Sequence, residues 1–147
     1  MPIKDEVRAL PIGKAEVLTT GTDVVILGIG VTVIAALEAK KRLEDEHISV
    51  TVVNSRFVKP LDRELITSLA KKIPCVVTVE ENVIQGGFGS AVLECLSEEG
   101  VTENRILRLG IGDTFVEHGS QKILRAKYGL DGAGIAKAVA DMVKRSP

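Results

Sequence analysis

The sequence predicts one α/β domain, a three-layer α/β/α sandwich around a mostly parallel sheet. Continuous runs of β-branched and aliphatic residues, which are typical of strands buried on both faces, alternate along the chain with segments of helical spacing. A length of 147 residues suits one domain, and hydrophobic residues make up 45% of it, enough for a sizeable core. Because aromatic residues amount to only 3%, that core must be aliphatic.

The first half of the chain reads strand, strand, helix, strand. Lys14 to Leu18 can form a short strand after the turn signal Pro11-Ile12-Gly13, and Asp23 to Leu27 forms a buried strand. Residues 31–45 change to helical spacing, with apolar side chains on one side and charged ones on the other. Ile48 to Val53 is the next buried strand, which completes a strand–helix–strand unit of about thirty residues.

The second half repeats this alternation. Asp62 is the expected N-cap of a helix that Pro74 prevents from continuing, and Cys75 to Val79 forms the third buried strand. A glycine-rich turn then leads into a helix that stops at Gly100. The remaining expected elements are a strand over Arg105 to Leu109, a short helix near residues 121–127 and a closing helix begun by Asp131.

Charge and cysteine content exclude several functional classes. Nineteen basic against 20 acidic residues give a net charge of −1, so we expect no nucleic-acid partner and no adsorption to a membrane. The longest apolar run, Val24 to Leu37, is interrupted by glycine and is shorter than the roughly 20 residues that span a bilayer. Cys75 and Cys95 lie singly in apolar segments, which favours buried thiols and a cytoplasmic location.

The loop after the first buried strand departs from a dinucleotide fingerprint. Its sequence is GIGVTV, and Val33 stands where a third glycine is needed for close packing of helix and strand. Asn54 stands where an acid is needed to hold a ribose hydroxyl. We therefore expect these glycines to serve only a tight turn.

The most distinctive loop runs from Glu80 to Ser90 and reads EENVIQGGFGS. Glu80 and Glu81 point to opposite faces of a strand, so we expect one to hydrogen-bond a neighbouring loop while the other faces outward. The glycines leave backbone N–H groups free at a helix N-terminus, which suits an anion, but they equally allow another domain to approach closely. Because the loop holds no Lys or Arg, we favour the packing role.

The loop from Gly110 to Ser120 contains His118 beside Glu117. Adjacent residues rarely face each other, and no Ser or Cys nucleophile stands in a recognisable motif, so we expect a structural or interface histidine. Phe57 and Phe115 lie in loops of a chain poor in aromatics, which is typical of an interface. The chain assembles no nucleophile, base and oxyanion site, so we expect no catalytic, cofactor-binding or metal-binding residue in it.

Five segments in order carry a family resemblance. They are LPIGK at 10–14, RFVKPLD at 56–62, VEEN at 79–82, GGFGS at 86–90 and DTFVEHG at 113–119. Together they resemble the C-terminal domain of 1-deoxy-D-xylulose-5-phosphate synthases, over essentially everything after about residue 10. The resemblance implies the transketolase C-terminal fold, whose five-stranded sheet has its first strand antiparallel to the rest. It also implies a linker over 1–10 and a domain over 11–147.

The resemblance further implies that the parent enzyme is a transferase dependent on thiamine diphosphate and magnesium. It would join pyruvate, with loss of carbon dioxide, to D-glyceraldehyde 3-phosphate, and the product feeds isoprenoid, thiamine and pyridoxal phosphate synthesis. In that family the cofactor-binding domains precede this one, so the fragment would bind no cofactor and would be inactive alone. Its partners would be those preceding domains, and it would help to build a homodimer.

The residues expected at the interdomain surface lie in loops at one end of the sheet. They are Arg56, Phe57, Glu80, Glu81, Asn82, Gly86, Gly87, Phe88, Gly89, Ser90, Asp113, Phe115 and His118. The apolar side chains expected to be exposed there are Phe57, Val83, Ile84, Phe88 and Phe115. Two alternatives stay open: the equivalent domain of another thiamine enzyme, such as a transketolase or a 2-oxo acid dehydrogenase β subunit, and a stand-alone anion-binding module that uses Gly86 to Ser90.

Overall fold

A computed structural model describes residues 9–145, so most of the expected linker and the last two residues of the expected domain lie outside the described residues. Five strands form one sheet in the order β1-β3-β2-β4-β5. They are β1 (Glu16–Thr19), β2 (Val24–Gly28), β3 (Val50–Asn54), β4 (Cys75–Val83) and β5 (Arg105–Ile111). β1 pairs antiparallel with β3 at one edge, and the other pairs are parallel, which confirms the expected mixed sheet.

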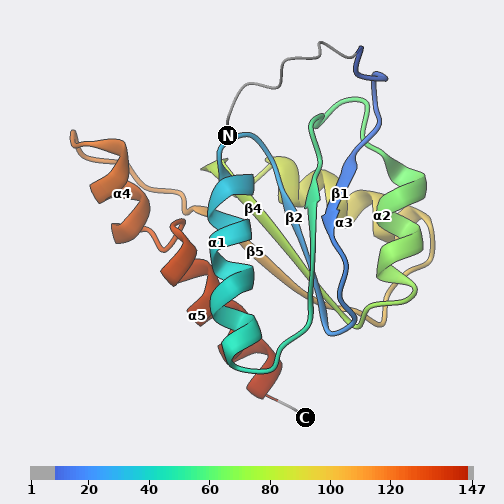
Figure 1. Ribbon diagram of the computed structural model, residues 1–147. Coiled ribbons are helices and arrows are strands. Elements are labelled where there is room, and N and C mark those ends of the chain that lie inside the picture. The colour runs from blue at the N-terminus through green and yellow to red at the C-terminus, as the bar shows by residue number, and fades with distance from the viewer. Residues whose placement is uncertain (1–8, 146–147) are drawn as a thin grey trace.

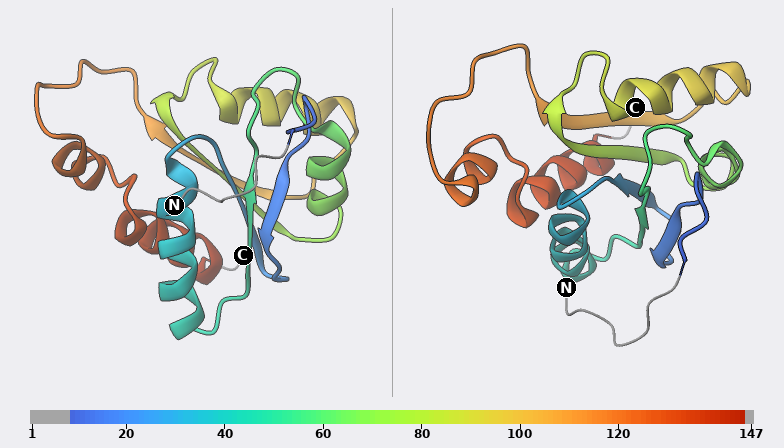
Figure 2. Two further views of the ribbon diagram at one scale, coloured as in Figure 1. Left: turned by 45° about the horizontal axis from the view of Figure 1, so that its top comes forward. Right: turned by 90° about the horizontal axis from the view of Figure 1, so that it is seen from above.

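Helices cover both faces of this sheet (Figures 1 and 2). Within residues 9–145 they are α1 (Thr32–Asp45), α2 (Arg63–Ala70), α3 (Phe88–Glu98), α4 (Gln121–Lys127) and α5 (Gly132–Lys144). Side chains of α1 and α5 pack into one apolar core, and side chains of α2 and α3 pack into the other. The fold is therefore the predicted three-layer sandwich, from which α4 projects at the side (Figure 1).

The central strand β2 explains why the apolar runs of the sequence are continuous. All of its residues are buried. Val24 and Ile26 belong to the core under α1 and α5, whereas Val25 and Leu27 belong to the core under α2 and α3. Each such side chain stabilises the fold by about 1.5–3 kcal/mol on burial, so both faces of the strand must be apolar.

The predicted helix caps are confirmed. The Asp62 carboxylate accepts hydrogen bonds from the Leu65 amide at 3.2 Å and from the Ala15 amide at 2.9 Å. It therefore caps α2 and also holds the segment that enters β1. The Asp131 carboxylate accepts from the Gly134 amide at 2.8 Å and caps α5. Caps of this kind satisfy amides that the first turn of a helix leaves without partners.

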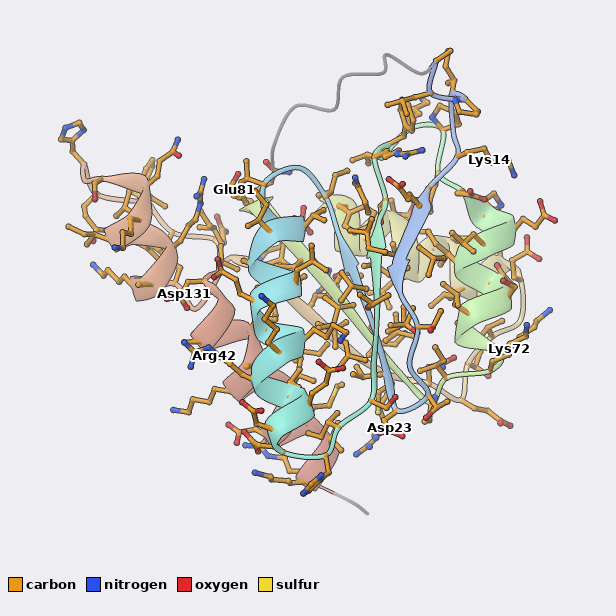
Figure 3. The ribbon with its side chains drawn as sticks, in the orientation of Figure 1. Lys14, Asp23, Arg42, Lys72, Glu81 and Asp131 are labelled. Atoms are coloured by element: carbon orange, nitrogen blue, oxygen red, sulfur yellow. The ribbon has the colours of Figure 1, made fainter. Side chains whose placement is uncertain are left out.

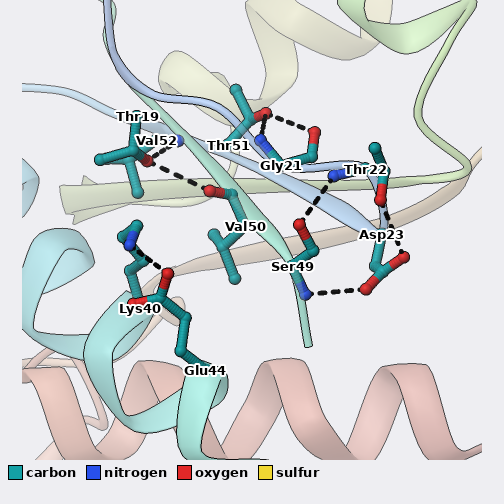
Figure 4. Close-up of polar contacts among 10 residues, drawn as sticks. All are labelled: Thr19, Gly21, Thr22, Asp23, Lys40, Glu44, Ser49, Val50, Thr51 and Val52. Atoms are coloured by element: carbon teal, nitrogen blue, oxygen red, sulfur yellow. Dashed lines mark hydrogen bonds and ion pairs between the residues drawn. The ribbon is translucent and has the colours of Figure 1, made fainter. Parts of the chain in front are cut away.

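Hydrogen bonds join the turn before β2 to the start of β3, at the amino ends of these strands (Figure 4). The Gly21 amide donates to the Thr51 hydroxyl at 2.8 Å, and the Thr22 amide donates to the Ser49 hydroxyl at 3.2 Å. The Asp23 carboxylate accepts from the Ser49 amide at 2.7 Å. These contacts satisfy polar groups at this end of the sheet within the domain. In open α/β sheets the functional residues generally lie at the opposite end, where the strands reach their carboxyl ends.

Two strands run further than the sequence pattern predicts. The pattern ends β4 at Val79, but the strand continues to Val83, so residues 80–82 lie in a strand rather than a loop. β5 likewise continues to Ile111. Pairing between the two strands extends them, and a register shift between Val79 and Val83 accommodates the extra length. Pairing between strands distant in the sequence is a tertiary effect, so the local sequence pattern does not predict where these strands end.

Candidate functional site

The carboxyl ends of β4 and β5 bring two of the predicted loops together. We call the surface formed by residues 81–87 and 112–123 the loop edge. The Ile84 amide donates to the Ile111 carbonyl oxygen at 2.9 Å, which joins the turn after β4 to the end of β5. The Arg108 guanidinium of β5 donates to the Ile84 carbonyl oxygen at 3.2 Å and to the Ser90 hydroxyl at 3.0 Å. A basic residue thus reaches this turn from another strand.

Glu80 is the only acid of the described residues that is fully buried, and it faces α3. Its carboxylate accepts hydrogen bonds from the Phe88 amide at 2.7 Å and from the Gly89 amide at 2.8 Å. The prediction that one of the paired glutamates hydrogen-bonds a neighbouring turn is confirmed. Because the chain's own carboxylate occupies these amides at the N-terminus of α3, the stand-alone anion-binding alternative loses the donors on which it depends.

Glu81 points the other way and is exposed. Its carboxylate forms an ion pair with the Arg125 guanidinium of α4 at 2.6 Å, which ties α4 to the end of β4. Figure 3 places Glu81 at the opposite end of the molecule from Asp23 and Lys72. The two adjacent glutamates therefore serve different contacts, one inside the domain and one on its surface.

Glu117 and His118 do not form an acid–base pair. The Lys127 ammonium and the Tyr128 hydroxyl both donate hydrogen bonds to the Glu117 carboxylate, the latter at 3.0 Å. The bond from Lys127 is the main cause that lowers the pKa of Glu117 to about 2, and the same contact raises the pKa of Lys127. His118 is exposed, as its predicted interface role requires. The carboxylate therefore holds the loop against the end of α4.

The loop edge exposes several apolar side chains. Phe115 is fully exposed, and the other exposed ones are Val83, Val116 and Ile123. Sequence analysis missed Val116 and Ile123. The adjacent apolar pair Ile123 and Leu124 in a short helix was an available signal for the second, because neighbouring residues of a helix point in different directions. Exposed apolar side chains are typical of surfaces that contact another protein, so the loop edge is a candidate interface.

The expectation that Phe88 is exposed is wrong. Phe88 is 1% exposed and belongs to the core under α2 and α3. It is the first residue of α3, and Gly86, with a φ of +71°, turns the chain so that this residue enters the sheet face. Phe57 and Ile84, also expected to be exposed, are half-buried.

Arg56 and Phe57 lie outside the loop edge, in the segment that follows β3. The Arg56 guanidinium pairs with the Glu16 carboxylate of β1 at 2.6 Å. A second exposed apolar area lies on this segment and on the residues that precede β1, with Leu10, Ile12 and Val58 as its members. The structure therefore places the predicted interface residues that reach the surface in two places on the domain, and it buries Glu80, Phe88 and Gly89.

The cysteines, possible metal ligands and helix lengths of the described residues bear on other classes of site. Cys75 and Cys95 are free buried thiols, and burial raises the pKa of Cys95. Residues 9–145 contain no group of three or more His, Cys, Asp or Glu side chains arranged to hold a metal ion. No helix in this part of the chain is long and apolar enough to cross a membrane.

A five-stranded sheet in this order, with its first strand antiparallel to its neighbour and helices on both faces, is the arrangement of a transketolase-type C-terminal domain. The chain matches the family described as "Transketolase, C-terminal domain" over residues 13–135 and belongs to that family. Its curated relatives include 1-deoxy-D-xylulose-5-phosphate synthase 1 of Geobacter sulfurreducens, 55% identical over 138 residues, which are 94% of this chain and 22% of the relative. The corresponding synthase 1 of Geobacter metallireducens is 56% identical over 92% of this chain and 22% of its own length. The predicted resemblance is confirmed.

The chain spans about a fifth of the length of these relatives. Among solved structures, one described as "Split gene transketolase, inactive beta4 tetramer" matches with a TM-score of 0.83 and 39% identity, over 97% of this chain and 45% of that one. A transketolase mutant from Pichia stipitis matches with a TM-score of 0.61 and 16% identity, over 90% of this chain and 18% of that one. That second likeness shows the shared fold alone.

Proposed function

We propose that this chain is the C-terminal domain of a 1-deoxy-D-xylulose-5-phosphate synthase and supports chemistry that takes place on the preceding domains. The parent reaction would join pyruvate to D-glyceraldehyde 3-phosphate with loss of carbon dioxide. Identity of 55% over 94% of the chain supports this parent over a transketolase. The remaining four-fifths or so of each relative has room for the domains that would hold thiamine diphosphate and magnesium.

The observation that carries the proposal is that the carboxylates of Glu80 and Glu117 are hydrogen-bonded within the domain. Glu80 is bound to the amides that an external anion would need, and Glu117 is bound by Lys127 and Tyr128. The loop edge instead offers exposed apolar side chains, above all Phe115. Such a surface suits docking to protein rather than turnover of a small polar substrate.

We further propose which parts of the surface make contact. The loop edge would face the preceding domains, and its predicted contact residues are Glu81, Asn82, Gly86, Gly87, Asp113, Phe115 and His118. The segment with Arg56 and Phe57 would form a second contact. The split-gene transketolase is described as a tetramer, which supports self-assembly of the parent, and we propose that the parent is a cytoplasmic homodimer.

A graft tests the proposal. This chain would replace the matching 22% of the Geobacter sulfurreducens synthase, and formation of 1-deoxy-D-xylulose 5-phosphate would be measured with thiamine diphosphate and magnesium present. We expect the graft to be active, the synthase without its last domain to be inactive, and this chain alone to be inactive. The same graft in a transketolase, expected to fail, tests the alternative parent.

Two results would contradict the proposal: turnover of pyruvate by this chain alone, or a folded graft without activity. Calorimetry with phosphate, nucleotides and thiamine diphosphate tests the anion-binding alternative. We expect no binding heat for the isolated chain, because the donors at the N-terminus of α3 are already occupied.

A further inference from the structure

We propose that Glu80 is a positioning residue of the loop edge. Its buried carboxylate holds the turn between β4 and α3 against the end of β5, so that the loop edge has one fixed shape before it meets a partner. The inference rests on the proposed function, in which this edge docks against the preceding domains.

The burial of the Glu80 carboxylate is offset by hydrogen bonds. The side chain is 0% exposed, and a carboxylate without water around it is costly unless charged hydrogen bonds replace the lost hydration. Two short bonds from the Phe88 and Gly89 amides, at 2.7 and 2.8 Å, supply this replacement at the positive end of α3. An apolar side chain would fill the space without that cost, but it would leave both amides without partners.

The surroundings of Glu80 are built closely around its side chain. A Cβ atom at Gly87 would lie 2.1 Å from the Glu80 Oε2 atom, and one at Gly110 would lie 3.0 Å from its Cγ atom. Gly87 precedes α3 and Gly110 lies in β5. One side chain of β4 is therefore in contact with both of the elements that lead to the loop edge.

Arg108 holds the same turn from the other side. Its guanidinium donates to the Ile84 carbonyl oxygen and to the Ser90 hydroxyl, at 3.2 and 3.0 Å. Gly89 lies between the two sides: a Cβ atom there would be 2.6 Å from the Thr78 hydroxyl oxygen and 3.0 Å from the Arg108 Cδ atom. The turn is thus clamped between β4 and β5. A surface that is already ordered loses less conformational entropy when a partner binds.

Amide hydrogen exchange on the full chain tests the clamp. The variant Glu80→Gln keeps the shape of the side chain, but its amide group has one acceptor oxygen for two amides and opposes N–H with N–H. We expect the Phe88 and Gly89 amides to exchange about tenfold faster or more, with faster exchange also in residues 112–120. The adjacent variant Glu81→Gln is the matched control and should leave the Phe88 and Gly89 amides unchanged.

Chemical complementation separates positioning from general loss of stability. The variant Glu80→Ala removes the carboxylate, and we expect acetate or formate, but not chloride at equal ionic strength, to restore protection of the Phe88 and Gly89 amides. Where Glu80→Ala is too unstable to purify, Glu80→Asp keeps the charge but shortens its reach, and we expect it to give the same local loss. Unchanged exchange in Glu80→Gln, or an equal rise at every amide of the chain, would overturn the proposal.

The active graft separates this inference from the proposed function. We expect Glu80→Gln in the graft to lower its activity at a temperature where circular dichroism shows the protein folded, with the loss confined to assembly with the preceding domains. If the unmutated graft fails, the proposed function fails, while the exchange result still decides whether Glu80 is a clamp. If the Glu80→Gln graft assembles and works like the unmutated one, the positioning role is refuted.

Discussion

Two phenylalanines that look alike in the sequence should respond in opposite ways to replacement by alanine. Phe88 is 1% exposed and packs in the core under α2 and α3, whereas Phe115 is fully exposed on the loop edge. Truncation of a buried phenylalanine costs about 3–5 kcal/mol, because transfer free energy is lost and a cavity remains. Replacement of an exposed side chain changes the free energy of unfolding by less than about 0.5 kcal/mol.

Unfolding in urea measures this difference as a free energy, and thermal unfolding measures it as a change in melting temperature. Both are followed by far-ultraviolet circular dichroism. The chain has no tryptophan and one tyrosine, so intrinsic fluorescence is a poor probe. For a domain of this size, about 2–4 °C in melting temperature corresponds to 1 kcal/mol, so Phe88→Ala should lower the melting temperature by roughly 6–20 °C. Phe115→Ala should leave the melting temperature within about 2 °C of the original.

The second measurement is activity of the synthase graft. Phe115→Ala should weaken assembly with the preceding domains without a change in stability, because Phe115 contributes only outward surface. A loss of more than about 1.5 kcal/mol of stability in Phe115→Ala, or of less than about 1 kcal/mol in Phe88→Ala, would refute the assignment of the two side chains.

Three further substitutions test contacts elsewhere in the domain. Thr32→Val should cost about 1–2 kcal/mol in urea unfolding, since the buried hydroxyl bonds to two carbonyl oxygens and one amide; a neutral result would contradict this role. Asp62→Ala should cost about 2 kcal/mol by the same assay, because two amides lose their acceptor, and Asp62→Asn should recover part of that loss. The pKa of Glu117 is lowered to about 2, so its contacts with Lys127 and Tyr128 should be complete above about pH 4.5 and lost as pH falls toward 2. Glu117→Gln should loosen the loop already at neutral pH. Retained amide protection of the loop in this variant would count against the ion pair.

The sequence alone was sufficient for the layers and most of the elements. Burial of β2 on both faces and the caps at Asp62 and Asp131 depend on neighbouring residues, and their patterns were visible in the chain. The family also followed from ordered local motifs, and the match over residues 13–135 confirmed it. Short-range periodicity and capping are properties of adjacent residues, so they can be recognised before any tertiary contact is known.

The tertiary structure decided which residues meet at the candidate site and which of the two glutamates is buried. Pairing of β4 with β5 extended both strands, buried Glu80 against α3 and left Glu81 on the surface. It also brought Arg108 to a turn whose own sequence holds no basic residue. Which of Phe88 and Phe115 is exposed depends on the same pairing, because the direction of the chain after β4 fixes where α3 begins. These contacts join residues far apart in the chain, and only the packed sheet places them together.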